Sequence, residues 1–143
     1  MILPDVNVLI GAFRPDHPHH SICRPWLSSV IGEQAPFGIS PLTLSAVVRI
    51  TTRVGHSGKA NPLAEAFGFC DDLLGQPHCR LIEPGQRHWQ LFNRLCLETE
   101  TRGPRVTDAW FAALAIEWSC EWITLDRDYA RFPGLKWSLP AAA

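Results

Sequence analysis

Apolar residues fill the first thirteen positions, MILPDVNVLIGAF, and are interrupted early by an acid. Pro4 separates a run too short for a helix from a segment in which the apolar positions of Val6 to Ala12 favour one. The sequence therefore predicts a short strand that passes into a helix, with Asp5 at the end of the strand. Because charged side chains are seldom buried without a partner, Asp5 requires a specific explanation.

Short apolar runs alternate with segments of helical periodicity along the rest of the chain. We predict strands at 35–39, 79–84, 120–126 and 135–139, and helices within 14–31 and at 42–54, 63–74, 88–100 and 107–120. GHSGKANP, residues 55–62, is expected to be a loop. This alternation indicates an α/β domain with a mostly parallel sheet.

Two helix starts and two helix faces are predicted in more detail. We expect Ser40 to cap the helix that Pro41 opens, and Thr107 to cap the helix that carries Asp108 in its first turn. Apolar spacing predicts the buried faces of two other helices. These faces comprise Ile22, Trp26, Leu27 and Val30 in the one, and Leu63, Ala66, Phe67, Cys70 and Leu74 in the other.

Length and composition limit the classes of protein that fit. The 143 residues suit a single domain over 1–143, and a formal charge of -1 excludes a strongly basic nucleic-acid-binding domain. The five cysteines include no C-x-x-C pair, which argues against a zinc site or a disulfide framework. No stretch is long and apolar enough to cross a membrane, so we expect a cytoplasmic protein.

Three acids separated in sequence are predicted to meet at one edge of the sheet. Asp5 and Asp126 each end a strand, Asp108 begins a helix, and Asp128 could reach the same place. Clustered carboxylates repel one another unless a cation neutralises them. Mg²⁺ and Mn²⁺ take oxygen ligands and assist phosphodiester cleavage, so the pattern points to a metal-dependent nuclease.

Most of these acids also have a structural explanation. Asp108 would stabilise the helix dipole, whereas Asp126 and Asp128 could be turn or cap residues. Asp5 has no such turn chemistry, and Asn7 offers a polar side chain to orient it.

Several arginines flank the predicted acidic edge. Arg105 and Arg127 adjoin acidic segments and are the candidates for binding substrate phosphate, although a solvated surface explains each equally well. Arg49, Arg53 and Arg102 lie in neighbouring segments. The histidine cluster DHPHH, residues 16–20, lacks further metal-binding side chains, so we interpret it as a solvated loop and helix start.

Four segments in order, DVNVLI, SPLTLSAVVRITT, VTDAWFAALA and ITLDRDYARFPGL, together resemble the PIN-domain ribonucleases, and specifically the VapC toxins of toxin-antitoxin pairs. The resemblance covers nearly the whole chain. It implies a three-layer α/β/α sandwich, an acidic Mg²⁺ or Mn²⁺ site and endonuclease cleavage of RNA. A homodimer and inhibition by a cognate VapB-type antitoxin are also implied.

The resemblance assigns roles to individual residues. Asp5, Asp108 and Asp126 match the family's acids, and Asp128 matches the second acid of a D-x-D variant. The family usually carries a glutamate where this chain has Ala46, so the site lacks one carboxylate. Val6 stands where a small hydroxyl residue is common, which removes another polar group.

Three functional hypotheses follow. The first is a metal-dependent endoribonuclease toxin, with Asp5, Asp108 and Asp126 as metal ligands and catalytic acids, Asp128 as a further ligand, and Asn7 and Thr107 supporting them. The second is an RNA-binding or antitoxin-binding module that keeps the fold but has weakened catalysis. A phosphate-accepting receiver domain fits poorly, because the chain lacks the expected acid pair and late lysine.

Overall fold

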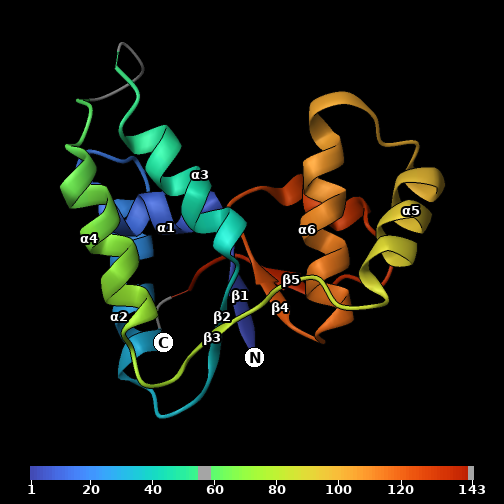
Figure 1. Ribbon diagram of the computed structural model, residues 1–143, viewed down its shortest axis with the longest axis horizontal. Coiled ribbons are helices and arrows are strands. Elements are labelled where there is room, and N and C mark those ends of the chain that lie inside the picture. Colours follow the sequence, from blue (N-terminus) through green and yellow to red (C-terminus); the bar gives the residue numbers. More distant parts are fainter. Residues whose placement is uncertain (55–58, 142–143) are drawn as a thin grey trace.

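The computed structural model describes residues 1–54 and 59–141, so half of the loop predicted at 55–62 lies outside the described residues. Strands form a central layer, with α1 to α4 on one side and α5 and α6 on the other (Figure 1). The three-layer α/β/α arrangement is as predicted. The helices are α1 (Val6–Phe13), α2 (His20–Gly32), α3 (Pro41–Thr51), α4 (Leu63–Leu74), α5 (His88–Thr99) and α6 (Val106–Glu117), with short 3-10 helices η1 (Gly103–Arg105) and η2 (Arg127–Arg131).

All strand pairs in the described part of the chain are parallel. β1 (Ile2–Pro4) pairs with β4 (Glu121–Ile123), and β4 pairs in turn with β5 (Trp137–Ser138). β2 (Phe37–Ile39) pairs with β3 (Cys79–Leu81). β1 and β2 lie side by side, so the two small sheets form one layer in the order β3, β2, β1, β4, β5.

A glycine permits close packing where the two small sheets meet. A Cβ atom at Gly38 would lie 2.7 Å from Ile82 Cγ1 and 3.3 Å from Leu3 Cδ1. Such separations are shorter than packed carbon atoms tolerate. A side chain at this position would therefore force the side chains of Ile82 and Leu3 to move.

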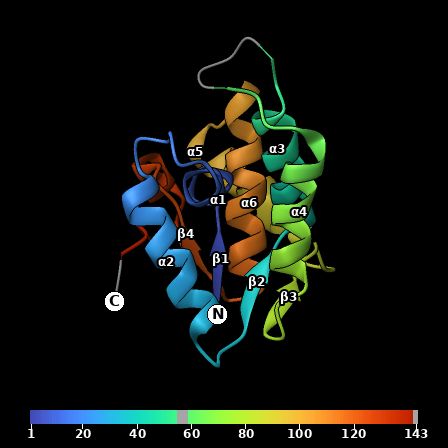
Figure 2. The same cartoon turned by 90° about the vertical axis from the view of Figure 1, so that its left-hand side faces the viewer.

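Each side of the sheet has its own apolar core. Val8, Leu9 and Ile39 are fully buried on the side of α1 to α4. Leu3, Leu114 and Trp122 are fully buried on the side of α5 and α6. Figure 1 shows the strands between the two helical layers, and Figure 2 shows β1 running up to α1. The turn from β1 into α1 therefore lies between Leu3 of one core and Val8 of the other.

The predicted faces of two helices are partly wrong. Trp26 and Leu27 of α2 are buried as expected, but Ile22 is 43% exposed. In α4 the structure buries Ala66, Cys70 and Leu73, whereas the predicted face also included Leu63, Phe67 and Leu74, all of which are exposed. Both helices carry apolar side chains on more than one face, so periodicity alone does not select the buried one.

Both predicted capping residues lack the expected hydrogen bond. Ser40 occupies the position before α3, but its buried hydroxyl has no hydrogen-bond partner among the described residues. Thr107 lies inside α6, because η1 precedes that helix and moves its start to Val106. Pro25 lies within α2 without ending it.

The remaining expectations concern cysteines and membranes. All five cysteines have free thiols. The spacing of the cysteines in the sequence likewise argued against a disulfide framework. Among the residues described, no helix combines the length and apolarity that crossing a membrane would require.

Candidate functional site

A cavity of about 680 Å³ opens at the carboxyl ends of β1 and β4. Three acids from separate parts of the chain line it: Asp5 after β1, Asp108 in the first turn of α6, and Asp126 before η2. Asn7 and Thr107 also line it. The structure therefore brings to one cavity the acids that the sequence predicted would meet.

Asp5 is fixed at the junction between β1 and α1. Its backbone N–H donates to the carbonyl of Ile123 at 2.8 Å, which extends the pairing of β1 with β4 by one residue. Its carboxylate caps α1 by accepting the Val6 N–H at 2.6 Å. The same side chain accepts from Thr124 Oγ1 at 2.7 Å and from Asn7 Nδ2 at 3.2 Å. Asn7 thus orients Asp5 as predicted.

Asp5 is only 7% exposed, and burial raises the pKa of its carboxyl to about 6. The hydrogen bonds from Thr124 and Val6 oppose this shift, and the charges of Asp108 and Asp126 add to it. The ionised form of Asp5 is therefore unfavourable in free energy, because the side chain is buried and lies near two other carboxylates. A cation bound between these side chains would relieve that cost.

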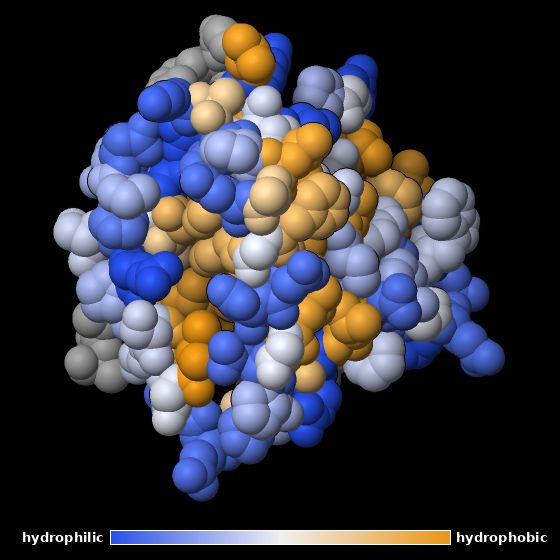
Figure 3. All heavy atoms as spheres, turned by 60° about the vertical axis from the view of Figure 1, so that its left-hand side comes forward, coloured by the Kyte–Doolittle hydropathy of each residue, from blue (hydrophilic) through white to orange (hydrophobic). Residues whose placement is uncertain are grey.

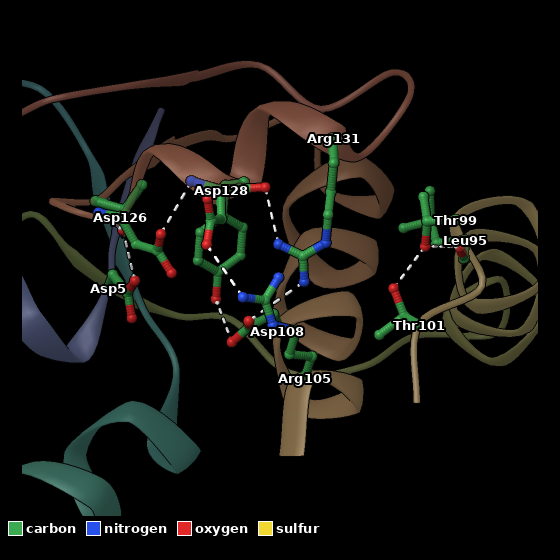
Figure 4. Close-up of polar contacts among 11 residues, drawn as sticks. Asp5, Leu95, Thr99, Thr101, Arg105, Asp108, Asp126, Asp128 and Arg131 are labelled. Carbon is green, nitrogen blue, oxygen red and sulfur yellow. Dashed lines mark hydrogen bonds and ion pairs between the residues drawn. The ribbon is translucent and has the colours of Figure 1, made fainter. Parts of the chain in front are cut away.

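Asp108 is held less tightly, from the side of the cavity formed by η2. Its Oδ1 accepts from the Tyr129 hydroxyl at 3.3 Å, and its Oδ2 pairs with Arg131 Nη2 at 3.4 Å. Burial, together with the nearby carboxylates, raises the pKa of Tyr129 far above its usual range, so the hydroxyl remains a donor. Figure 4 shows Asp108 and Arg131 side by side, with Asp5 and Asp126 beyond them.

Asp126 and Asp128 occupy different environments. Asp126 lies three residues after β4, because that strand ends at Ile123 and is shorter than predicted. Its Oδ1 accepts the N–H of Asp128 at 2.9 Å. The Asp128 side chain is 60% exposed, does not line the cavity and pairs with Arg105 at 3.4 Å (Figure 4).

The two arginines proposed for phosphate binding lie outside the cavity lining. Arg105 contacts Asp128, and Arg127 is exposed on η2. Two other arginines, Arg14 and Arg49, do line the cavity. Neither Arg14 nor Arg131, which contacts Asp108, was singled out from the sequence.

The chemistry of the donor set suits a hard divalent cation, because the acid end of the cavity presents carboxylate oxygens. Within residues 1–54 and 59–141, however, no three carboxylate, imidazole or thiol groups lie close enough to hold a metal ion as they stand. Ala46 lines the cavity at the position of the family's usual glutamate, so no carboxylate comes from that point of α3. Asp108 is already paired with Arg131 at 3.4 Å.

Three residues that contact Asp5 or Asp108 could not be predicted from the spacing of residues along the sequence. Thr124 lies inside the predicted strand 120–126, but its hydrogen bond to Asp5 was not predicted. Tyr129 and Arg131 follow Asp126 at intervals that point them toward Asp108 only because η2 is a 3-10 turn. The sequence signal is the charged and aromatic run RDYAR, in which the sequence indicated roles for Arg127 and Asp128 but not for Tyr129 or Arg131.

Comparisons with known proteins agree with this architecture. The PIN domain family matches residues 2–135. Ribonuclease VapC25 of Mycobacterium tuberculosis is 38% identical over 136 residues, which cover 95% of this chain and 96% of that protein. Ribonuclease VapC43 of the same species is 32% identical over 140 residues, covering 98% and 95%.

Solved structures show the same fold at lower sequence identity. VapBC2 from Rickettsia felis, bound to a DNA fragment from its promoter, matches with a TM-score of 0.72 and 18% identity, covering 97% of this chain and 98% of that one. The sarcin-ricin loop cleaving toxin VapC20 of M. tuberculosis matches with a TM-score of 0.66 and 14% identity, covering 94% and 98%. Taken with the full-length relatives, these matches establish that the chain belongs to the PIN domain family, among the VapC ribonucleases.

Proposed function

We propose that the protein is a Mg²⁺- or Mn²⁺-dependent endoribonuclease that acts in the cytoplasm as the toxin half of a VapBC-type pair. The observation that carries this proposal is the buried carboxylate of Asp5 in a cavity shared with Asp108 and Asp126. Relatives that match 95% and 98% of the chain are named ribonucleases, which supports the same reaction.

Asp5, Asp108 and Asp126 are the residues that would hold the cation, with Asp128 as a more distant candidate. A divalent ion supplies positive charge that lowers the pKa of a water and stabilises the phosphodiester oxygens. Thr124 and Asn7 keep Asp5 oriented toward the cavity. Tyr129 and Arg131 position Asp108. The Arg131 ion pair also offsets part of the negative charge of Asp108 before a cation binds.

The direct test compares two acid-to-amide variants. The wild-type protein, Asp5→Asn and the control Asp72→Asn, whose side chain is exposed on α4, would each be incubated with RNA in chelator and then with added Mg²⁺ or Mn²⁺. We expect wild type and the control to cleave only after metal is added, and Asp5→Asn to lose at least ~100-fold in rate. Cleavage by Asp5→Asn at the wild-type rate, or undiminished cleavage in chelator, would contradict the proposal.

A second candidate function, an RNA-binding or antitoxin-binding module with weakened catalysis, is favoured by two observations. Ala46 supplies no carboxylate, and Asp108 is already paired with Arg131. A calorimetric Mn²⁺ titration separates the two candidates. The nuclease should bind Mn²⁺ and lose that binding in Asp5→Asn, whereas the module should bind none in either form.

A VapB-type antitoxin is the proposed protein partner. Leu63, Phe67 and Leu74 of α4 are 61%, 53% and 41% exposed. Figure 3 shows apolar side chains gathered in a broken band on the face that carries α2 and α4. Exposed apolar surface of this kind commonly docks a partner helix. Substituting Phe67→Glu should weaken antitoxin binding in a pull-down while leaving RNA cleavage intact.

A homodimer is also proposed from the family resemblance. Trp89 and Leu97 on α5 are 69% and 75% exposed and could contact a second copy of the chain. Sedimentation of the purified protein should give twice the mass of the 16.0 kDa chain. A monomer at micromolar concentration would overturn this part of the proposal.

A further inference from the structure

The cavity is much longer than a metal site requires. Asn7, Ile10 and Arg14 line one wall from successive turns near α1, and Ala46, Arg49 and Ile50 line the facing wall from α3. Arg14 follows Asp5 by nine residues, which places it roughly 13 Å farther along the helix axis. The acids therefore occupy one end of the cavity, and the far end is formed by Arg14, Asp16, His17 and Pro18.

Arg14 is built into the far end rather than lying on the surface. Its side chain is 11% exposed, and its Nε and Nη2 donate to the two carboxylate oxygens of Asp16, each at 3.0 Å. Nη2 also donates to the carbonyl of Lys59 at 2.8 Å. Nη1 makes no hydrogen bond to the described part of the chain, so its two N–H groups are available to a ligand.

His17 presents a second donor. Its Nδ1 lies 3.1 Å from the backbone N–H of His19 and accepts from it, so the neutral ring carries its proton on Nε2. Partial burial and the neighbouring His19 lower the pKa of His17, which favours this neutral form. Gly11 lets the ring approach α1, because a Cβ there would lie 3.4 Å from His17 Nδ1 and 2.8 Å from Cys23 Sγ.

The surroundings of these donors suit an uncharged planar ring better than a phosphate. Ile10, Ile50 and Pro18 supply apolar walls. The charges of Arg14 and Asp16 cancel, and His17 is neutral, so these three side chains offer hydrogen-bond donors with little net positive charge, and Arg49 on the facing wall adds a single one. Phosphate binding draws instead on uncompensated positive charge.

We propose that the far end of the cavity is a base-reading pocket. It accepts one nucleobase of the bound RNA, at a position near but not next to the cleaved bond, and selects bases with an exocyclic carbonyl oxygen through Arg14 Nη1 and His17 Nε2. Guanine, uracil and cytosine carry such an oxygen and adenine does not, so adenine is disfavoured. This inference rests on the proposed ribonuclease function and deepens it by naming the residues that set sequence preference.

Matched substitutions at His17 isolate one donor. In His17→Asn the amide oxygen replaces Nδ1 as acceptor for the His19 N–H, but no group replaces Nε2. In His17→Gln the amide nitrogen lies near the position of Nε2 and restores a donor. Arg14→Lys keeps a positive charge beside Asp16 and removes Nη1, and Arg94→Lys, an exposed partner of Glu98 on α5, is the control.

The experiment maps cleavage sites in a random RNA library with Mg²⁺ or Mn²⁺. For wild type, His17→Gln and Arg94→Lys we expect adenine to be disfavoured about five-fold at one flanking position, the value of roughly one hydrogen bond. In His17→Asn and Arg14→Lys this preference should fall below about two-fold at that position alone. Thermal melts would verify that each variant is folded.

Two outcomes overturn the pocket. One is an unchanged preference in both His17→Asn and Arg14→Lys. The other is a uniform loss of cleavage across all sequences with a shallower salt dependence, which identifies a phosphate contact instead.

A binding measurement separates this inference from the proposed function. The Asp5→Asn protein would be titrated with short labelled RNAs that differ only by adenine or guanine at one position. Tighter binding of the guanine RNA, lost in Asp5→Asn/His17→Asn, supports the pocket even if no cleavage is seen, in which case the proposed function alone fails. Equal binding of both RNAs overturns the pocket even if cleavage is normal.

Discussion

Asp5 and Asp108 face the same cavity but are held in opposite ways. Asp5 is buried and accepts hydrogen bonds from Val6, Asn7 and Thr124, two of them at 2.7 Å or shorter. The Asp108 side chain is 30% exposed and is held by two contacts of 3.3 and 3.4 Å. One carboxylate is fixed before any ligand arrives, and the other is free to adjust.

This difference suggests that Asp5 mainly affects the stability of the fold, whereas Asp108 mainly affects function. Fixing Asp5 in its charged form costs stability, because burial favours the protonated acid. Asp108 avoids most of that cost by pairing with Arg131 and remaining partly in water. We therefore expect changes around Asp5 to alter stability strongly, and changes around Asp108 to alter mainly the function.

The largest effect on stability is expected at Thr124. Its hydroxyl donates to Asp5 and accepts from the N–H of Asp126 at 3.0 Å and from Asn7 Nδ2 at 3.3 Å. Thr124→Val removes all three contacts inside the core and should destabilise the protein by about 3 kcal/mol in urea denaturation. Thr124→Ser keeps the hydroxyl and should cost about 1 kcal/mol. A loss below 1 kcal/mol for Thr124→Val would contradict the rigidity ascribed to Asp5.

The next effect is a pH dependence that Asp5 alone should produce. Its folded pKa is about 6, against 3.8 for an ordinary aspartate, so the contribution of Asp5 to stability is fully present below pH 4 and is lost as pH rises to 6 and above. The loss amounts to about 3 kcal/mol in the absence of metal. Asp5→Asn does not titrate, so its stability relative to wild type should rise by about 2 kcal/mol between pH 4 and pH 7.5.

Unfolding in chelator at several pH values measures this difference. Carboxylates far from Asp5 titrate equally in both proteins, so their contributions cancel in the comparison. A constant difference between wild type and Asp5→Asn across this range would mean that Asp5 has an ordinary pKa in the folded protein.

Tyr129→Phe should have a smaller effect on stability and a clearer one on function. The substitution removes the 3.3 Å hydrogen bond to Asp108 and keeps the buried ring. We expect a loss of about 1 kcal/mol in stability and several-fold weaker Mn²⁺ binding by calorimetry. Unchanged Mn²⁺ affinity would show that Tyr129 does not position Asp108.

The smallest effects are expected at the two arginines near η2. Arg105 and Asp128 are both 60% exposed, so Arg105→Gln should change stability by less than about 0.5 kcal/mol. Arg131 is 23% exposed, contacts Asp108 and lies 4.3 Å from the Phe132 ring centre, so Arg131→Gln should cost about 1 kcal/mol. Equal losses of stability in Arg105→Gln and Arg131→Gln would show that the Arg131–Asp108 pair contributes no more than the exposed Arg105–Asp128 pair.

The sequence predicted the parallel α/β layers and the convergence of Asp5, Asp108 and Asp126 because both follow from local rules. Short apolar runs identified the strands, and the carboxyl ends of parallel strands share one edge. The prediction also identified Asn7 as a partner of Asp5. Asp128 was expected nearer to the metal than its pairing with Arg105 suggests, and its role as a ligand stays a prediction.

Features that depend on three-dimensional context could not be predicted in the same way. The exposed faces of α2 and α4 are apolar enough to mimic buried ones, so Ile22 and Phe67 were assigned to the core wrongly. The 3-10 turn before α6 moved Thr107 from a cap into the helix. The partners of Asp108 and the contacts of Arg14 join distant or irregular segments for which sequence spacing carries no signal.

The parallel pairing of β1 with β4 joins the second residue of the chain to the one hundred and twenty-first. A nascent polypeptide therefore holds Asp5 without its partner Thr124 for roughly ten seconds, at ordinary rates of ribosomal synthesis. Throughout that interval β4 is missing from the sheet, so Asp5, Asp108 and Asp126 are not yet held together at one cavity. A chain that cleaves RNA would thus be harmless to the ribosome that makes it until Thr124 and the rest of β4 have been synthesised.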